Sequence, residues 1–122
     1  MLRLLFADDD KSFADSIKIL LQKKGYYVDT AFDGKEALNL LQKMPYDILI
    51  TDIRMPGSSG LELITECRKL SQAIRIIAIS GGGYVPAEDY LRISRLFGAD
   101  SILQKPFFIE ELMAEIQKLT VS

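Results

Sequence analysis

Short apolar runs alternate with helical patterns along the whole chain, and this alternation constrains the fold more than any other feature of the sequence. Five runs predict strands over residues 2–7, 27–31, 47–51, 74–79 and 101–104. Apolar residues at helical spacing predict helices over residues 11–24, 33–44, 60–71, 87–97 and 109–119. Strands that alternate with helices in this way predict an α/β fold, with a parallel sheet covered by helices on both faces.

The same pattern indicates the order of the strands and the number of domains. A chain of 122 residues fits one domain, and for five parallel strands we expect the flavodoxin-like order 2-1-3-4-5. The first, third and fourth apolar runs are almost continuous, as in strands that are covered on both faces. No repeat or linker interrupts the pattern, so we predict a single domain over residues 1–122 with no output domain.

Composition argues against several classes of function. The net charge of −2 gives no bulk attraction for nucleic acid, and no apolar run approaches the ~20 residues of a membrane span. The sequence contains no histidine, which excludes histidine catalysis, histidine metal ligands and a phosphohistidine carrier. The single Cys67 cannot form an internal disulfide and is expected to pack within a helix. Because no secretory signal pattern opens the chain, we predict a cytoplasmic protein.

Acidic residues follow two of the predicted strands. Asp8, Asp9 and Asp10 come directly after the first strand, and Asp52 comes directly after the third. In the order 2-1-3-4-5 the strand order reverses between the first and third strands. Open parallel sheets bind ligands beyond the carboxyl ends of their strands at such a reversal. We therefore expect these acids to meet there. Asp10 is the exception, because a role as the cap of the following helix is favoured over metal contact.

A hydroxyl and an ammonium group belong to the other strand ends on this edge. Several close carboxylates cannot all stay ionised without compensation, so either a pKa rises or a cation binds. An oxygen-only set favours Mg²⁺ over zinc. Ser80 follows the fourth predicted strand, and Lys105 follows the fifth beside Pro106. A metal could bridge a carboxylate nucleophile and a phosphoryl group, while the lysine and the hydroxyl contact the remaining oxygens. The set indicates a phosphoryl-transfer site.

At this point the sequence resembles the receiver domains of bacterial two-component response regulators. The resemblance covers essentially the whole chain. It rests on four segments in order: "FADDD", "ILITDIRMPGSSGLELI", "IAISGGG" and "GADSILQKPF". All four segments, in this order and at suitable spacing, are strong evidence for the family.

The resemblance implies a role for each acidic residue of the site. Asp52 matches the phosphoacceptor. Asp8 and Asp9 match the acidic pair that holds Mg²⁺, with Mn²⁺ as an alternative ion, Asp9 directly and Asp8 through water. The backbone carbonyl of Arg54 matches a further metal ligand.

The resemblance also implies a switch, and here the sequence departs from the family. Ser80 matches the switch hydroxyl, Lys105 matches the ion-pair partner of the phosphoryl group, and a cis Lys105–Pro106 bond is expected. Many members carry an aromatic residue three positions before this lysine, where the present chain has Ile102. The stretch from Ser80 to Lys105 is also about three residues longer than in chemotaxis-type receivers, nearly one helical turn. We therefore expect an output surface different from that of typical members.

The leading hypothesis for function is a stand-alone signalling receiver. A histidine kinase or histidine phosphotransfer protein would donate a phosphoryl group to Asp52, and the change in conformation would regulate an unidentified protein partner. Direct nucleic-acid binding, membrane association and enzymatic activity beyond its own phosphorylation and dephosphorylation are not expected. One alternative is a metal-dependent phosphatase with an aspartyl intermediate, although Arg54 stands where such enzymes of the haloacid-dehalogenase type carry a second acid. Another is a receiver-like binding module that is not phosphorylated.

Overall fold

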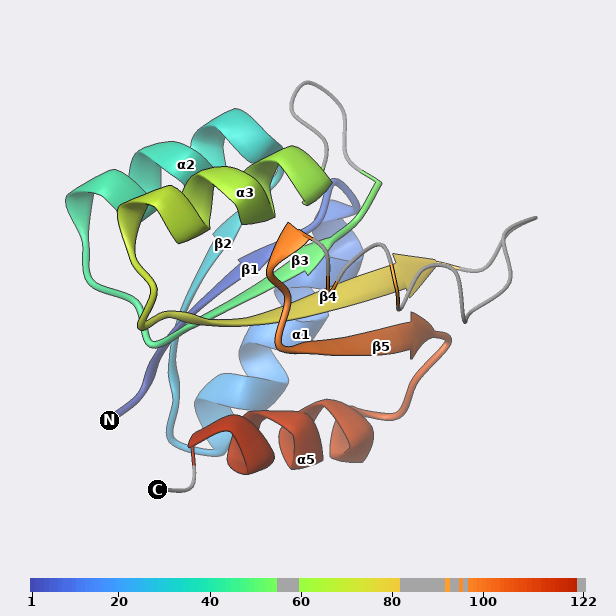
Figure 1. Cartoon of the computed structure of the whole chain (residues 1–122). Helices are drawn as coiled ribbons and strands as arrows, with labels where there is room; N and C mark the ends of the chain where they lie inside the picture. The colour runs from blue at the N-terminus through green and yellow to red at the C-terminus, as the bar shows by residue number, and fades with distance from the viewer. Residues whose placement is uncertain (55–59, 82–91, 93–94, 96, 121–122) are drawn as a thin grey trace.

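Five parallel strands form one sheet in the computed structural model, which describes residues 1–54, 60–81, 92, 95 and 97–120. The order β2-β1-β3-β4-β5 confirms the predicted topology, and every neighbouring pair is parallel. The arrowheads of β4 and β5 point toward the same edge of the sheet (Figure 1). The strands are β1 (Arg3–Ala7), β2 (Tyr27–Ala31), β3 (Ile48–Asp52), β4 (Arg75–Gly81) and β5 (Ser101–Lys105).

Helices cover both faces of the sheet, as predicted. They are α1 (Lys11–Lys23), α2 (Gly34–Lys43), α3 (Gly60–Leu70) and α5 (Ile109–Thr120). Helices α2 and α3 lie on one face, and α1 and α5 lie on the other (Figure 1). The predicted helix over 87–97 lies outside the described residues except at 92, 95 and 97, which are helical. In the part of the chain that the structure describes, no helix is long and apolar enough to cross a membrane.

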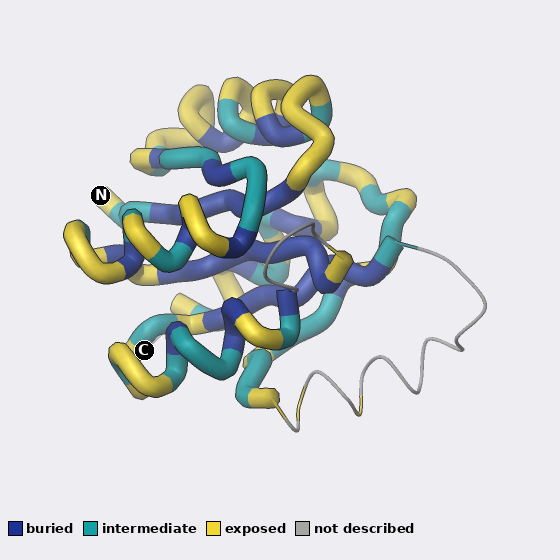
Figure 2. The backbone as a smooth tube through the Cα atoms, turned by 90° about the horizontal axis from the view of Figure 1, so that it is seen from above, coloured by how far each residue is buried: buried dark blue, intermediate teal, exposed yellow. Residues whose placement is uncertain are grey.

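Side chains of successive strand residues enter two separate cores. Leu5 and Leu49 pack with α2 and α3, whereas their neighbours Phe6 and Ile50 pack with α1 and α5. All four side chains are fully buried, and the strands run through the buried centre of the molecule (Figure 2). This two-sided burial explains the almost continuous apolar runs in the sequence. Cys67 lies buried in the α2 and α3 core, as expected.

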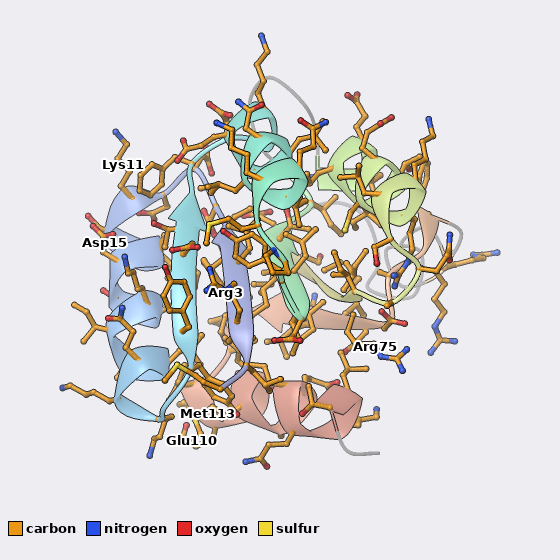
Figure 3. The ribbon with its side chains drawn as sticks, turned by 90° about the vertical axis from the view of Figure 1, so that its left-hand side faces the viewer. Arg3, Lys11, Asp15, Arg75, Glu110 and Met113 are labelled. Atoms are coloured by element: carbon orange, nitrogen blue, oxygen red, sulfur yellow. The ribbon has the colours of Figure 1, made fainter. Side chains whose placement is uncertain are left out.

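Local signals fix the ends of α1. The Asp10 carboxylate accepts a hydrogen bond of 3.1 Å from the Phe13 amide, which makes Asp10 the N-cap of this helix. Gly25 follows the helix with a φ of +96°, a conformation that glycine adopts without steric cost. On the solvent side, Lys11 and Asp15 project away from the sheet (Figure 3). Helix α1 therefore begins directly after the three aspartates that follow β1.

Three strands extend beyond their predicted ends. The apolar pattern placed the ends of the third, fourth and fifth strands at Thr51, Ile79 and Gln104, but β3 continues to Asp52, β4 to Gly81 and β5 to Lys105. The cause is cross-strand pairing, because Ser80 lies opposite Gln104 and Gly81 lies opposite Lys105. The sheet ladder itself therefore fixes the backbones of Ser80 and Lys105.

At the amino-terminal end of the sheet, where the strands begin, Arg68 forms a network of hydrogen bonds. Arg68 near the end of α3 donates to the carbonyl oxygens of Gly98 (2.9 Å) and Ile74, and to an Asp100 carboxylate oxygen (2.6 Å). The same Asp100 oxygen accepts the Ile76 amide at 2.7 Å, and the Asp100 amide donates to the Ile76 carbonyl at 2.8 Å. These bonds tie α3 to the starts of β4 and β5.

Candidate functional site

Three carboxylates meet at the carboxyl ends of β1 and β3. Asp8 and Asp9 follow β1, Asp52 is the last residue of β3, and one oxygen from each lies within 4.8 Å of the others. Asp8 and Asp52 are buried, with 1% and 7% of their surface exposed, whereas Asp9 is exposed. The adjacency of β1 and β3 brings together acids that lie far apart in the sequence. The predicted meeting of these acids is confirmed.

Lys105 at the end of β5 supplies the cation of the cluster. Its ammonium Nζ lies 2.9 Å from Asp8 Oδ2 and 3.2 Å from Asp52 Oδ2. Partial burial by itself lowers the pKa of Lys105, but the hydrogen bond to Asp8 and the charge of Asp52 outweigh it and leave the pKa raised. Lys105 is therefore held in its charged form between the two buried acids.

Backbone amides orient the two buried carboxylates. Asp8 Oδ1 accepts the Asp10 amide at 2.9 Å, and Asp52 Oδ1 accepts the Arg54 amide at 2.9 Å. Burial nevertheless raises the pKa of Asp8, because the bonds to Asp10 and Lys105 only partly offset the loss of solvation. Each carboxylate thus has one oxygen toward a backbone amide and the other toward Lys105.

The donor set of this cluster fits a hard divalent cation. Asp8, Asp9 and Asp52 carry three negative charges when ionised, and Lys105 carries one positive charge, so the formal sum is −2. All the donors are carboxylate oxygens, the ligands that Mg²⁺ and Mn²⁺ prefer. Asp10 is not one of the three clustered acids and instead caps α1, as the sequence favoured.

A buried hydroxyl without a partner lies on the neighbouring strand. Ser80 is 2% exposed, and its Oγ is the one buried side-chain polar atom without a hydrogen bond among the described residues. A buried polar group without a partner costs free energy, on the order of 1–3 kcal/mol. Ser80 follows Ile79, the β4 residue that pairs with Asp52, so the hydroxyl belongs to the same edge of the sheet. It could donate to an oxygen of a bound anion.

The structure shows one detail that the family resemblance implied and one position where the chain departs from the family. The Lys105–Pro106 peptide bond is cis, as expected. Ile102 is half-buried against the α2 and α3 core, so an aliphatic side chain occupies the place where many members carry an aromatic ring.

Sequence reasoning missed two contacts of the site. Phe13 fits the apolar pattern of α1, yet its ring lies against the Lys105 ammonium at 4.5 Å from the ring centroid. Gly60 is the first residue of α3, and a Cβ at this position would lie 2.0 Å from the Asp52 carbonyl oxygen. Neither contact has a local signal in the sequence, because each joins residues that only the tertiary fold brings together.

A cavity of about 430 Å³ opens beside the ammonium group. It is lined by Asp10, Phe13, Lys105, Pro106 and Phe107. The Lys105 ammonium also bonds to Asp8 and Asp52 of the carboxylate cluster. Lys105 therefore belongs both to the charged cluster and to the lining of a mainly apolar cavity.

Fold and site together are those of a signalling receiver, and comparison with known proteins agrees. The family model for the response regulator receiver domain matches residues 4–117. The chain belongs to this family, which serves two-component signalling.

Curated relatives in this family are longer than the present chain. The transcriptional regulatory protein DltR of Streptococcus agalactiae is 37% identical over 120 residues, which cover 98% of this chain and 52% of that protein. The response regulator ArlR of Staphylococcus aureus is 34% identical over 122 residues, with coverage of 98% and 52%. The chain thus spans about half the length of the curated relatives it matches.

Solved structures share the fold over nearly the entire chain. The response regulator TrrA of Thermotoga maritima, in complex with Mg(2+)-BeF, has a TM-score of 0.85 and 36% identity, and the match covers 98% of this chain and 99% of that one. The chemotaxis protein CheY4 of Vibrio cholerae has a TM-score of 0.88 and 33% identity, with 98% of both chains covered.

Proposed function

We propose that this chain accepts a phosphoryl group on Asp52 from the phosphohistidine of a histidine kinase or a histidine phosphotransfer protein. The observation that carries the proposal is the position of the Asp52 carboxylate. One of its oxygens is held by the Arg54 amide and the other by the Lys105 ammonium, beside two further acids and a buried hydroxyl. Mg²⁺ is the proposed cofactor, with Mn²⁺ as an alternative, and the ligands are Asp8, Asp9, Asp52 and the Arg54 carbonyl.

The residues of the site can perform this transfer without a base. An oxygen of Asp52 forms a bond to phosphorus as the phosphorus–nitrogen bond of the donor breaks, and the electron pair of that bond stays on the imidazole. A bound divalent cation supplies charge neutralisation for the phosphoryl oxygens. Lys105 donates to one phosphoryl oxygen, and the Ser80 hydroxyl donates to another. Ser80 thereby gains a hydrogen-bond partner, which it lacks among the residues that the structure describes.

Phosphorylation then shifts a conformational equilibrium that a protein partner reads. We expect residues 1–122 to form a receiver domain that acts in the cytoplasm and itself contacts neither nucleic acid nor membrane. We expect no enzymatic activity from it beyond its own phosphorylation and dephosphorylation. Ile102 replaces the aromatic group that accompanies the hydroxyl in many members. The output surface is therefore proposed to differ from theirs.

Transfer from a labelled phosphohistidine donor tests the proposal. Wild-type protein with Mg²⁺ should take up an acid-labile, hydroxylamine-sensitive label, whereas Asp52→Asn and a sample with chelator should not. Undiminished labelling of Asp52→Asn would overturn the assignment. Turnover of small phosphate esters would instead favour a phosphatase, although Arg54 stands where such an enzyme needs an acid. Failure to bind Mg²⁺ would favour a binding module that is not phosphorylated.

A further inference from the structure

The side chain of Phe13 contacts the reactive site through Lys105. The ammonium nitrogen lies 4.5 Å from the centroid of the Phe13 ring, within the range of cation–π attraction. Lysine has three ammonium protons, and two of them account for the bonds to Asp8 and Asp52. The electron-rich face of the ring is thus a third partner, supplied by α1 rather than by the sheet.

Two further aromatic rings hold the Phe13 ring in place. Phe6 of β1 is fully buried and lies 6.0 Å from it between centroids, at an interplanar angle of 56°. Phe107 after β5 lies at 5.9 Å and 74°, an edge-on arrangement. Such tilted and edge-on pairs are favourable geometries for aromatic rings. The ring that faces the ammonium is therefore held from two sides.

Lys105 needs such a constraint because its head group has space to move. Its side chain is 27% exposed, and it lines the cavity of about 430 Å³ together with Phe13 and Phe107. If the Phe13 ring were absent, the long side chain could turn into this space. Lysine carries high rotamer entropy, so holding its head over Asp52 requires fixed contacts.

The partners of the ammonium also change in chemistry during the proposed reaction. The carboxylates of Asp8 and Asp52 would bind the metal ion, and phosphorylation would use an oxygen of Asp52. The Phe13 ring takes part in neither event. We propose that Phe13 is a positioning residue, whose ring face keeps the Lys105 ammonium over Asp52 before and after phosphoryl transfer. This inference deepens the proposed function and rests on it for the effect on rate.

A double-mutant cycle tests the contact without any phosphoryl group. Phe13→Leu, Lys105→Met and the double variant would be compared in urea unfolding of the metal-free chain. If the ring and the ammonium attract each other, the two changes should be coupled by about three- to tenfold in the unfolding equilibrium constant. Additive effects would overturn the inference, because a ring that only fills space does not sense the charge of Lys105.

A variant of nearly unchanged shape tests whether the Phe13 ring acts on Lys105 by electrostatic attraction. Trifluorophenylalanine at position 13 keeps the ring but weakens its negative face. It should slow phosphorylation by a small acyl phosphate donor about three- to tenfold, as should Phe13→Leu, whereas Phe13→Tyr should restore the rate. A fluorinated variant that reacts like the wild type would overturn the inference. A wild type that takes up no phosphoryl group would overturn the proposed function and leave the unfolding cycle to decide on Phe13.

Discussion

The two ends of the sheet each hold a cation against carboxylate, and they differ in how completely their polar groups are paired. At the amino-terminal end, Arg68 bonds to the carbonyl oxygens of Gly98 and Ile74 and to Asp100. Arg75 lies 3.9 Å from the other Asp100 oxygen and projects outward (Figure 3). The planar guanidinium of arginine offers five donors, enough to satisfy several acceptors at once.

At the carboxyl end the pairing is incomplete. Lys105 faces three clustered acids, which leaves a formal charge of −2, and the buried Ser80 hydroxyl has no described partner. One end therefore has its charges and hydrogen bonds satisfied by the chain itself, while the other can gain partners from a cation and an anion. Polar groups without a partner among the described residues therefore identify the functional end better than the presence of an ion pair does.

The largest expected effect is at Gly60, on the functional end. In Gly60→Ala the new Cβ would collide with the Asp52 carbonyl and the Ile53 Cα, at 2.0 and 2.6 Å, and backbone atoms cannot give way cheaply. We expect a loss of about 3 kcal/mol or more in the free energy of unfolding, measured in urea.

Gly98, at the amino-terminal end of the sheet, is the matched control for Gly60. Its φ is +106°, and an added Cβ would meet the flexible Arg68 side chain at 2.9 Å rather than backbone. Gly98→Ala should cost less, about 1–2 kcal/mol. An equal or smaller loss for Gly60→Ala would contradict the tight packing of α3 on Asp52.

The next effect concerns Arg68. Arg68→Met would leave Asp100 and two carbonyl oxygens without this donor, so we expect a loss of about 2–3 kcal/mol in urea unfolding. Lys69→Met is the control, because the exposed pair of Lys69 with Glu66 contributes about 0.5 kcal/mol or less. If the two variants were equally stable, the amino-terminal network would not be structural.

Removing one negative charge from the carboxylate cluster should raise the free energy of unfolding, whereas the substitutions above lower it. Asp9 is exposed and lies among like charges, so Asp9→Asn should stabilise the metal-free chain by about 0.5–1 kcal/mol. The same variant should show a smaller rise in melting temperature with Mg²⁺ than the wild type. Calorimetry with and without Mg²⁺ measures both effects. A destabilised metal-free variant would mean that the three acids do not repel each other.

The smallest expected effect on stability comes from ionisation of the Cys67 thiol, beside Arg68 in α3. Burial raises the pKa of this thiol from its usual 9.0 to about 11. At pH 8 only about one thiol in a thousand is then ionised, so alkylation of the native chain should be far slower than in urea. Because the folded state holds this proton more tightly, stability should fall as pH rises above 9. Rapid alkylation of the native protein would contradict the buried position.

Much of this arrangement could be predicted from the sequence, since it depends on periodic patterns. The apolar runs gave the strands and their order, and the carboxyl ends of parallel strands had to bring Asp8, Asp9 and Asp52 together. The acidic residue before a helical pattern indicated that Asp10 is a cap. Each of these inferences uses neighbours in sequence or a general rule of sheet topology.

The remaining features depend on contacts between side chains that no local pattern encodes. The contact of Phe13 with Lys105 joins α1 to the end of β5, and Arg68 reaches Asp100 across the start of β4. The extension of β4 to Gly81 follows from pairing with β5 rather than from hydrophobicity. Such details require the packed fold, because the same residues would read as ordinary core or surface positions.

The position of the phosphoryl group on the chain decides whether Asp52 is the phosphoacceptor. The wild type would be phosphorylated by a phosphohistidine donor with and without Mg²⁺, reduced with borohydride to convert an aspartyl phosphate to homoserine, and mapped by peptide mass spectrometry. We predict the modification at Asp52 alone and only when Mg²⁺ is present. Modification at Asp8 or Asp9, or an equal yield in the presence of chelator, would contradict the account.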